Sequence, residues 1–176
     1  MNPKYLLLSA LLGGLVLFVW GAVYHAVIGI DSHTMKEFRD SDAVSGFVRG
    51  HADGNGMYYT KDGVLAAISV TGGVSDKSQD MGPALGKQFV INVVIAGLLA
   101  WLLTFTGIRT PLCTAGLFGL AGVAAGISAW ISAWVWYNHS MAFALAAVAD
   151  LAVGFLLAGL VIGWVRGKLA PPALPG

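Results

Sequence analysis

Charged side chains are scarce in this chain. Only 10 of its 176 residues are Lys or Arg and 9 are Asp or Glu, a charged fraction of 11%, against roughly 25% in soluble domains. The formal net charge of +1 comes without a basic stripe or a nucleic-acid motif, so no nucleic-acid partner is expected. A hydrophobic fraction of 57% and a mean hydropathy of +0.75 instead indicate an integral membrane protein.

Cysteine is nearly absent as well. Cys113 is the only one, which excludes an internal disulfide framework and a cysteine-based metal site. The sequence also lacks a nucleophile with an adjacent base, a phosphate-binding loop and a zinc motif. We therefore expect no enzymatic activity and no metal, and nothing in the sequence requires a cofactor.

Long hydrophobic runs are what the sequence does contain. Four of them reach the roughly 17 to 25 residues that a membrane-spanning helix needs; they are residues 5–29, 89–108, 112–136 and 141–165. Pro111 after Thr110 marks the start of the third helix, because proline fits the first helical turn and threonine can cap it. The sequence thus predicts an all-α membrane protein with four transmembrane helices.

The positions of Lys and Arg predict the orientation of these helices. Short basic flanks are retained on the cytoplasmic side of a membrane; here they are Lys4, Arg109, Arg166 and Lys168. We therefore predict that both termini lie in the cytoplasm, with residues 166–176 as a cytoplasmic tail. Aromatic residues are expected in the membrane interfaces, with Trp164 on the inner side and the following residues on the outer side: Trp20, Tyr24, Trp134, Trp136 and Tyr137.

The segment 31–88 joins the first two helices and has the composition of a soluble region. Ser41 or Asp42 can cap a short helix, and two strand-like runs flank Asp62-Gly63, a dipeptide suited to a two-residue type I′ turn. We predict a small exported α+β cap, a helix plus a hairpin, that is too small to be stable alone. It is expected to lie on the outer surface of the helix bundle or on a partner protein.

Glycines predict where the transmembrane helices pack. Small residues let helix backbones approach each other in lipid. In the third and fourth helices they are Gly116, Gly119, Gly122, Gly126, Gly154, Gly159 and Gly163. We expect these faces to form a packed bundle or to contact neighbouring subunits.

One ionisable residue, Asp150, interrupts the fourth hydrophobic run. Counted from the outer end of that run it lies about 15 Å deep, at the midplane of a ~30 Å hydrocarbon core, where such a residue is by default a functional-site hypothesis. Ser128 of the third helix reaches a similar depth and is the expected partner, with Ser132 one turn nearer the outside. Three interpretations remain open: a neutral carboxyl group that joins helices, a proton or cation relay, and a hydrogen bond to a cofactor or another subunit.

His25 raises a separate question, because an imidazole near a membrane interface can ligate haem iron or chlorophyll magnesium. It is the only one of the four histidines within a predicted helix, so no second helix-borne ligand accompanies it. We interpret His25 as an interfacial side chain bonded to backbone or water next to Tyr24. Contact with lipid or with a tetrapyrrole pigment is the weaker alternative.

Three stretches carry a family resemblance: "GGLVLFVWGAVYH" at 13–25, "HTMKEFRDSDAV" at 33–44 and "DLAVGFLLAGLV" at 150–161. They resemble an uncharacterised family of small bacterial four-helix inner-membrane proteins. In that family a Trp-Gly pair precedes a short exported segment and an aspartate opens a glycine-rich last helix, and Trp20, Gly21 and Asp150 match. The resemblance implies topology and location, and no established activity.

These features predict a non-enzymatic accessory subunit of a larger energy-transducing membrane complex, respiratory or photosynthetic, which it stabilises or organises by helix packing. The exported segment and the proline-rich residues 170–176 are expected to be engaged by neighbouring subunits. The alternative is a small ion, proton or solute pathway that uses Asp150, as a homo-oligomer because four short helices enclose little cavity. A sensor or envelope-maintenance role through residues 31–88 is a third hypothesis.

Overall fold

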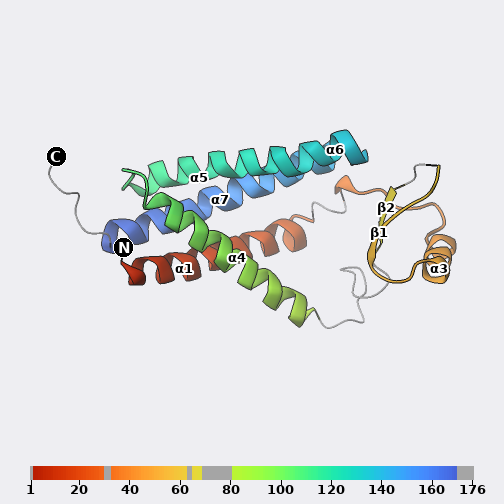
Figure 1. Ribbon diagram of the computed structural model, residues 1–176, viewed down its shortest axis with the longest axis horizontal. Helices are drawn as coiled ribbons and strands as arrows, with labels where there is room; N and C mark the ends of the chain where they lie inside the picture. Colours follow the sequence, from red (N-terminus) through yellow and green to blue (C-terminus); the bar gives the residue numbers. More distant parts are fainter. Residues whose placement is uncertain (1, 30–32, 63–64, 69–80, 170–176) are drawn as a thin grey trace. The chain divides into compact units, whose positions relative to one another are not determined.

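The computed structural model describes residues 2–29, 33–62, 65–68 and 81–169, which form two compact units (Figure 1). Unit 1 comprises Met1–Thr34 and Ala84–Gly176, and unit 2 comprises Met35–Pro83. Four helices are long and apolar enough to cross a membrane. The chain is therefore a multi-pass membrane protein, as its hydrophobic runs predicted. The tail residues 170–176 lie outside the described residues.

The first span is one continuous helix of two geometries. α1 (Pro3–Ala22) begins at Asn2, whose side chain accepts a hydrogen bond from the backbone N–H of Lys4 at 3.1 Å. Proline at the first helical position leaves no donor unsatisfied there. The α-helix then passes into a π-helical segment, η1 (Val23–Val27), so the span ends close to the predicted position.

The third span covers Pro111–Tyr137, close to the predicted residues 112–136. Thr110 Oγ1 accepts a hydrogen bond from the backbone N–H of Cys113 at 3.3 Å, and Pro111 is the first residue of α5 (Pro111–Gly126), which confirms the predicted cap. The span continues through the π-helical η2 (Ile127–Ile131) and α6 (Ser132–Tyr137). Asn138 then adopts a left-handed conformation with φ 54°, a common way to end a helix.

The other two spans differ from their predicted bounds. α4 is Gly82–Leu103 rather than 89–108. The predicted start was too late because the polar Lys87 and Gln88 were assigned to the preceding loop. Pro83 is the local signal for the earlier start, since proline suits a first helical turn. α7 is Met141–Leu169. Residues 166–169, predicted as the start of the tail, therefore belong to this helix.

The four spans converge at one end of unit 1, and α4 alone leaves the others toward the opposite end (Figure 1). At the end where α1 begins and α7 ends, Asn2 Nδ2 donates a hydrogen bond to the carbonyl oxygen of Leu169 at 3.0 Å. The apolar core there includes Tyr5, Leu103, Phe118, Ile162 and Val165. α5 runs along α7, whereas α4 crosses α1 and leaves it toward its own N-terminal end (Figure 1), where residues 82–88 are exposed.

Glycines bring α5 and α7 into close contact. A Cβ atom added to Gly126 would lie 2.8 Å from Cα of Val148, and one added to Gly163 would lie 2.7 Å from Cα of Pro111. Such separations are shorter than carbon–carbon van der Waals contact, so only glycine fits. Close approach to the facing helix is also found at Gly119, Gly122 and Gly159.

Gly116 is the exception among the predicted packing glycines of α5. A Cβ atom there would meet nothing within 4 Å, and the residue is exposed. The stripe that faces α7 runs through Ala115, Gly119, Gly122 and Gly126 at spacings of four and three, the periodicity of one helix face. Gly116 lies one position outside that stripe and does not pack against α7; for this glycine, contact with a neighbouring subunit stays a prediction.

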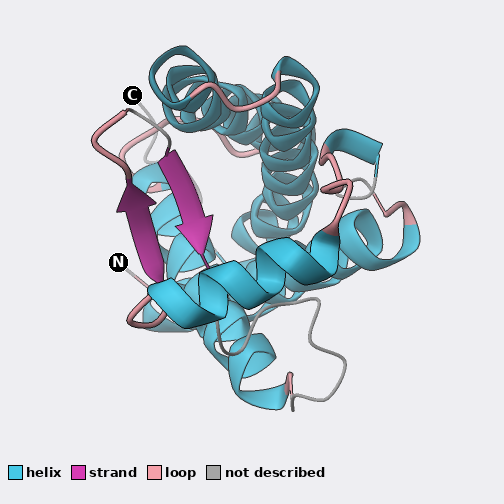
Figure 2. Ribbon diagram, turned by 90° about the vertical axis from the view of Figure 1, so that its right-hand side faces the viewer, coloured by secondary structure: helices cyan, strands magenta, loops and turns pink. Residues whose placement is uncertain are grey.

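Unit 2 contains the predicted helix and hairpin. α3 (Ser41–His51) is followed by β1 (Gly56–Tyr59) and β2 (Leu65–Ile68), which pair antiparallel with Gly56 opposite Ile68 and Tyr59 opposite Leu65 (Figure 2).

Two local details of unit 2 differ from the prediction. The cap of α3 is Asp40, whose Oδ1 accepts a hydrogen bond from the backbone N–H of Ala43 at 2.9 Å, rather than Ser41 or Asp42. Residues 60–64 separate the last paired positions of the strands, so the connection is longer than a two-residue turn. Gly63 itself lies outside the described residues.

The two kinds of glycine on α5 provide a matched pair of variants. We expect Gly122→Ala to lower the free energy of unfolding by about 1–3 kcal/mol, because its methyl group would press on the backbone of Leu151. Gly116→Ala should leave it unchanged or slightly raised, since alanine favours helix. Thermal unfolding in mild detergent, followed by circular dichroism, measures both; equal destabilisation would contradict the α5–α7 contact described here.

Candidate functional site

The carboxyl group of Asp150 lies in the contact between α1 and α7. Nε1 of Trp20 donates hydrogen bonds to Oδ1 of Asp150 at 2.8 Å and to its backbone carbonyl at 3.1 Å. One turn further along α1, Oη of Tyr24 donates to the carbonyl oxygen of Ala146 at 2.7 Å. The two donors and the two acceptors are each four residues apart, so both bonds follow one face of each helix. They form a short ladder between two antiparallel helices.

Gly154 makes room for the indole ring of Trp20. A Cβ atom on Gly154 would lie 3.0 Å from Cδ1 of Trp20 and 3.5 Å from a methyl carbon of Leu17. Gly154 and Asp150 are four residues apart and therefore share a face of α7. The glycine lets the ring approach α7, and the ring nitrogen then reaches the carboxylate one turn away. The predicted packing glycine and the predicted polar residue thus form one arrangement.

The hydrogen-bond partner of Asp150 is Trp20, whereas the sequence had suggested Ser128. Ser128 lies in η2 and Ser132 begins α6, and both side chains are exposed. Depth along the helix axis suggested the pairing, but rotation about the axis decides it, because the face of α5 that meets α7 carries Gly122 and Gly126. Within the described part of the chain, no hydrogen bond joins either serine to Asp150.

His25 approaches the second oxygen of the same carboxyl group. Its Nε2 lies 3.7 Å from Oδ2 of Asp150, an ion-pair distance if the imidazole is protonated. The side chain of His25 is 51% exposed and that of Asp150 23% exposed, and the His25 ring meets that of Tyr24 edge-on at 5.5 Å. His25 lies in the π-helical η1, a local geometry that is frequent at functional sites.

Two aromatic residues predicted for the membrane interface, Trp20 and Tyr24, also form a helix contact. Tyr24 is buried and its ring lies 5.5 Å from that of Trp20, so both side chains belong to the α1–α7 contact. The four-residue spacings of Trp20 with Tyr24 and of Ala146 with Asp150 were the sequence signal for this ladder. The other predicted belt residues are exposed, as a belt requires: Trp134, Trp136, Tyr137 and Trp164.

The depth of Asp150 in the membrane depends on which part of α7 occupies the hydrocarbon. The 29 residues of α7 span about 43 Å, more than a ~30 Å hydrocarbon core. Asp150 lies roughly two thirds of the way from Leu169 toward Met141, at about 1.5 Å per residue. Its midplane position therefore stays a prediction.

Arg166 forms a second polar contact that the sequence interpretation missed. Only 6% of this residue is exposed, and its guanidinium donates hydrogen bonds to the carbonyl oxygens of Leu103 and, at 2.8 Å, Thr106. The last carbonyl groups of a helix such as α4 lack partners within the helix, and a cation there also interacts favourably with the helix dipole. Nearby, Oη of Tyr5 donates to the carbonyl oxygen of Ala100 at 2.9 Å. Arg166 thus connects α7 to the end of α4.

The hydrogen bonds of Trp20, Tyr24 and Arg166 attach helices to one another. The titratable pair His25 and Asp150 is partly exposed. Among the described residues, no group of three or more His, Cys, Asp or Glu side chains could hold a metal ion. Comparisons of the chain with protein-family models, with curated proteins and with solved structures find no match.

Removing the indole N–H tests the ladder. We expect Trp20→Phe to lower the stability by about 0.6–2 kcal/mol, the range of a polar contact between membrane helices. Asp150→Asn should cost less than Asp150→Leu, because the amide oxygen still accepts the bond from Trp20. The measurement is thermal unfolding in detergent, with Trp164→Phe as the control because Trp164 is exposed. A control that loses as much stability as Trp20→Phe would contradict the role of the N–H.

The buried arginine has its own matched control. Arg166→Gln should lower the stability by about 1.5–3 kcal/mol, because it removes charged donors from two carbonyl groups. Lys168→Gln removes the same charge from an exposed position of the same helix turn and should have little effect. The measurement is the thermal unfolding midpoint of each variant in mild detergent. Similar midpoints for the two variants would show that Arg166 acts only through its charge.

Proposed function

We propose that this protein is a non-enzymatic accessory subunit that stabilises or organises a larger energy-transducing membrane complex, respiratory or photosynthetic, by helix packing. The observation that carries the proposal is the use of the polar side chains in the spans. Trp20, Tyr24, Tyr5 and Arg166 all donate hydrogen bonds to backbone or carboxyl oxygens of another helix or its connection. A polar side chain that bonds another helix holds the two helices together. This pattern favours the interpretation of Asp150 as a packing residue.

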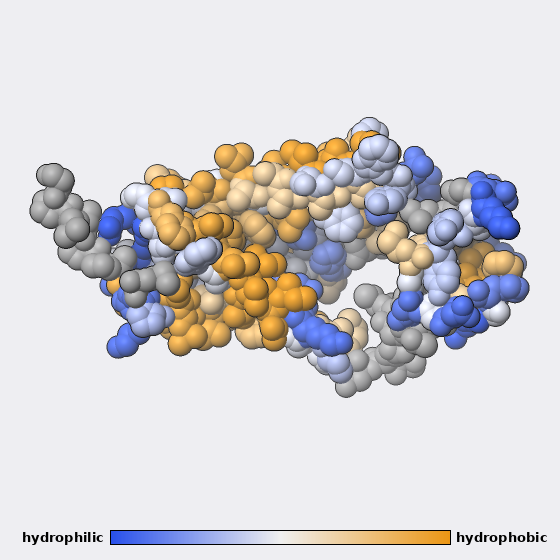
Figure 3. All heavy atoms as spheres, viewed as in Figure 1, coloured by the Kyte–Doolittle hydropathy of each residue, from blue (hydrophilic) through white to orange (hydrophobic). Residues whose placement is uncertain are grey.

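The exposed apolar surface of the spans supports a lateral association. In the most apolar window of each span, between 17% and 33% of the residues are buried, so most of each helix is available to lipid or to a neighbouring subunit. The N-terminal part of α4 is exposed and separates from the other spans (Figure 1), so a neighbouring subunit could pack against it on several sides. Figure 3 shows that apolar atoms dominate the visible face of unit 1.

We further propose a bacterial inner membrane with both termini in the cytoplasm. Support comes from the hydrogen bond between Asn2 and Leu169, which places the start of α1 beside the end of α7. Lys4, Lys168 and Arg109 are exposed near this end, as expected for the side on which positive charge is retained. The resemblance to the small four-helix family agrees with this location and stays a prediction. Contact of His25 with a tetrapyrrole pigment or lipid would be incidental to the proposed role.

The native mass of the protein tests the proposal. After extraction in a mild detergent, we expect a large hetero-complex, whose other proteins are identified by mass spectrometry and whose absorption spectrum reports any pigment. Asp150→Asn should leave most of this complex intact, since the bond from Trp20 can persist. A small, colourless homo-oligomer as the only species would overturn the accessory-subunit proposal.

The second candidate function is a small ion, proton or solute pathway that uses Asp150. The observation that favours it is the His25–Asp150 pair, whose two titratable groups lie 3.7 Å apart and partly exposed, since proton relays use such intramembrane groups. Asp150→Asn separates the two candidates in proteoliposomes. Lost ion flux with unchanged assembly would support the pathway, whereas lost assembly without any flux in the wild type would exclude it.

A further inference from the structure

Within the described residues of unit 2, helix α3 presents an apolar side that is only partly covered. Val44, Phe47 and Val48 lie at i, i+3 and i+4, so they share one side of the helix, while Ser45 lies on its flank and Arg49 farther round the helix. No residue of α3 is buried, and Phe47 is 66% exposed. An amphipathic helix normally buries its apolar stripe against a core; here Val44 and Val48 are half-buried, and Phe47 remains open.

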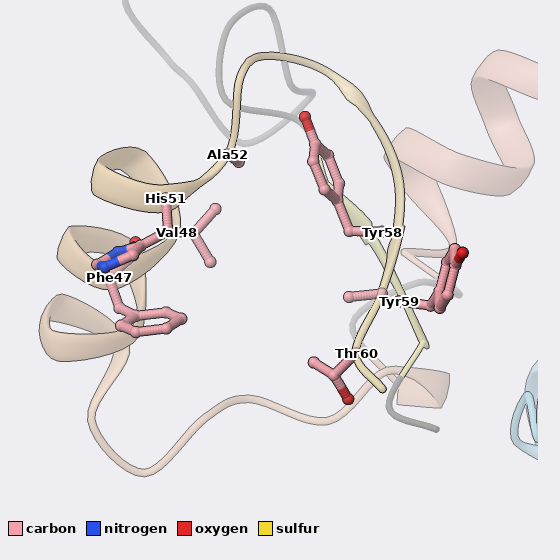
Figure 4. Close-up of a pocket in the computed structure, with 8 residues that line it drawn as sticks. Phe47, Val48, His51, Ala52, Tyr58, Tyr59 and Thr60 are labelled. Atoms are coloured by element: carbon pink, nitrogen blue, oxygen red, sulfur yellow. The ribbon is translucent and has the colours of Figure 1, made fainter. Parts of the chain in front are cut away.

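A hollow of about 320 Å³ adjoins this apolar side (Figure 4). Phe47, Val48 and His51 of α3 line one wall, and Tyr58 of the hairpin lines the opposite wall. The His51 ring stacks on that of Phe47 with centroids 4.3 Å apart, and its Nδ1 bonds the carbonyl oxygen of Phe47 at 2.9 Å. The Tyr58 hydroxyl donates to the carbonyl oxygen of Gly54 at 2.8 Å.

Nδ1 of His51 and the hydroxyl of Tyr58 are therefore bonded to unit 2 itself. What the hollow offers to an occupant is mainly carbon: the lining residues carry no charged side chain. Further large apolar side chains of unit 2 are exposed beyond the hollow, namely Met35, Phe38 and Met57. Apolar surface of this kind, surrounded by polar residues, marks an interaction site.

The chain connectivity indicates what covers this surface. Residues 28–40 join the first span to α3, and residues 69–81 join β2 to α4. Each connection has thirteen residues and reaches at most about 45 Å when fully extended. A bilayer that holds both flanking spans is therefore within reach of unit 2 at a high effective concentration, whereas a soluble partner must be found by diffusion.

We propose that unit 2 docks on the bilayer surface through the apolar side of α3, with Phe47 inserted and lipid carbon filling the hollow beside it. Helices with one apolar side and one polar side lie in the membrane interface in this way. Arg49 and Ser45, away from the apolar side, then face water.

Charge shows which lipid property drives the docking. The described part of unit 2 carries four basic residues, Lys36, Arg39, Arg49 and Lys61, and five acidic ones, Glu37, Asp40, Asp42, Asp53 and Asp62, a net charge of 4 − 5 = −1. Attraction to anionic headgroups needs clustered positive charge, which is lacking here. Docking is therefore apolar and independent of the headgroup charge.

Spin-label accessibility in proteoliposomes of the full chain tests the proposal. In a Cys113→Ser background, the label is placed at Val44→Cys on the apolar side, at Ser45→Cys as the control, and at Leu120→Cys as a lipid-exposed reference. We expect the ratio of oxygen to nickel-complex accessibility at position 44 to be several-fold above that at position 45. It should be the same in phosphatidylcholine vesicles and in vesicles that also contain phosphatidylglycerol.

The inserted side chain is tested in the same experiment. With the label at position 44, Phe47→Glu should lower the ratio to that of position 45, and Phe47→Leu should preserve it. Three results would overturn the proposal: equal access of the nickel complex to both positions, exclusion of both reagents from position 44, which indicates cover by protein such as a second copy, and a raised ratio that requires anionic lipid. None of these results bears on the native mass, so the accessory-subunit proposal is tested separately.

Discussion

Inside a bilayer there is no water to satisfy a polar group, and each one must find its hydrogen-bond partner within the protein. This constraint explains where some helices of unit 1 touch. The indole of Trp20 and the phenol of Tyr24 reach oxygen atoms of α7, and the guanidinium of Arg166 reaches carbonyl oxygens at the end of α4. Gly154 belongs to the same arrangement, because it yields space for the indole that bonds Asp150. Polar pairing thus marks the contacts of α7 with α1 and with the end of α4, whereas α5 and α7 meet through glycines such as Gly122 and Gly126.

The spans themselves could be predicted from hydropathy, because length and apolar composition are one-dimensional properties of the chain. One boundary was equally accessible: Thr110 and Pro111 act within a single helical turn. The periodicity of Gly119, Gly122 and Gly126 likewise predicted a close contact. What composition does not contain is rotation about the helix axis. All four spans are so uniformly apolar that no side is distinguished from another by hydrophobicity.

The misplaced residues show the same limit. Ser128 and Asp150 were paired by depth, yet the carboxyl group faces α1, and Gly116 was grouped with neighbours whose face it does not share. Arg166 was taken as a charged flank because it follows an apolar run, and its burial depends on carbonyl groups some sixty residues away in sequence. Partners that lie far apart along the chain leave no local signal. In unit 2, by contrast, the helix and hairpin were predictable because turn and strand patterns are local.

The pairing of α1 with α7 has a consequence for biogenesis. The ladder joins residues 20 and 24 to residues 146 and 150, so the first of the four spans is completed by the fourth. Until α7 enters the bilayer, the N–H of Trp20 and the hydroxyl of Tyr24 have to be accommodated by lipid headgroups, water or the insertion machinery. Assembly of unit 1 therefore waits for the fourth span, and the hydrogen bond between Asn2 and Leu169 forms only after the end of α7 has been made.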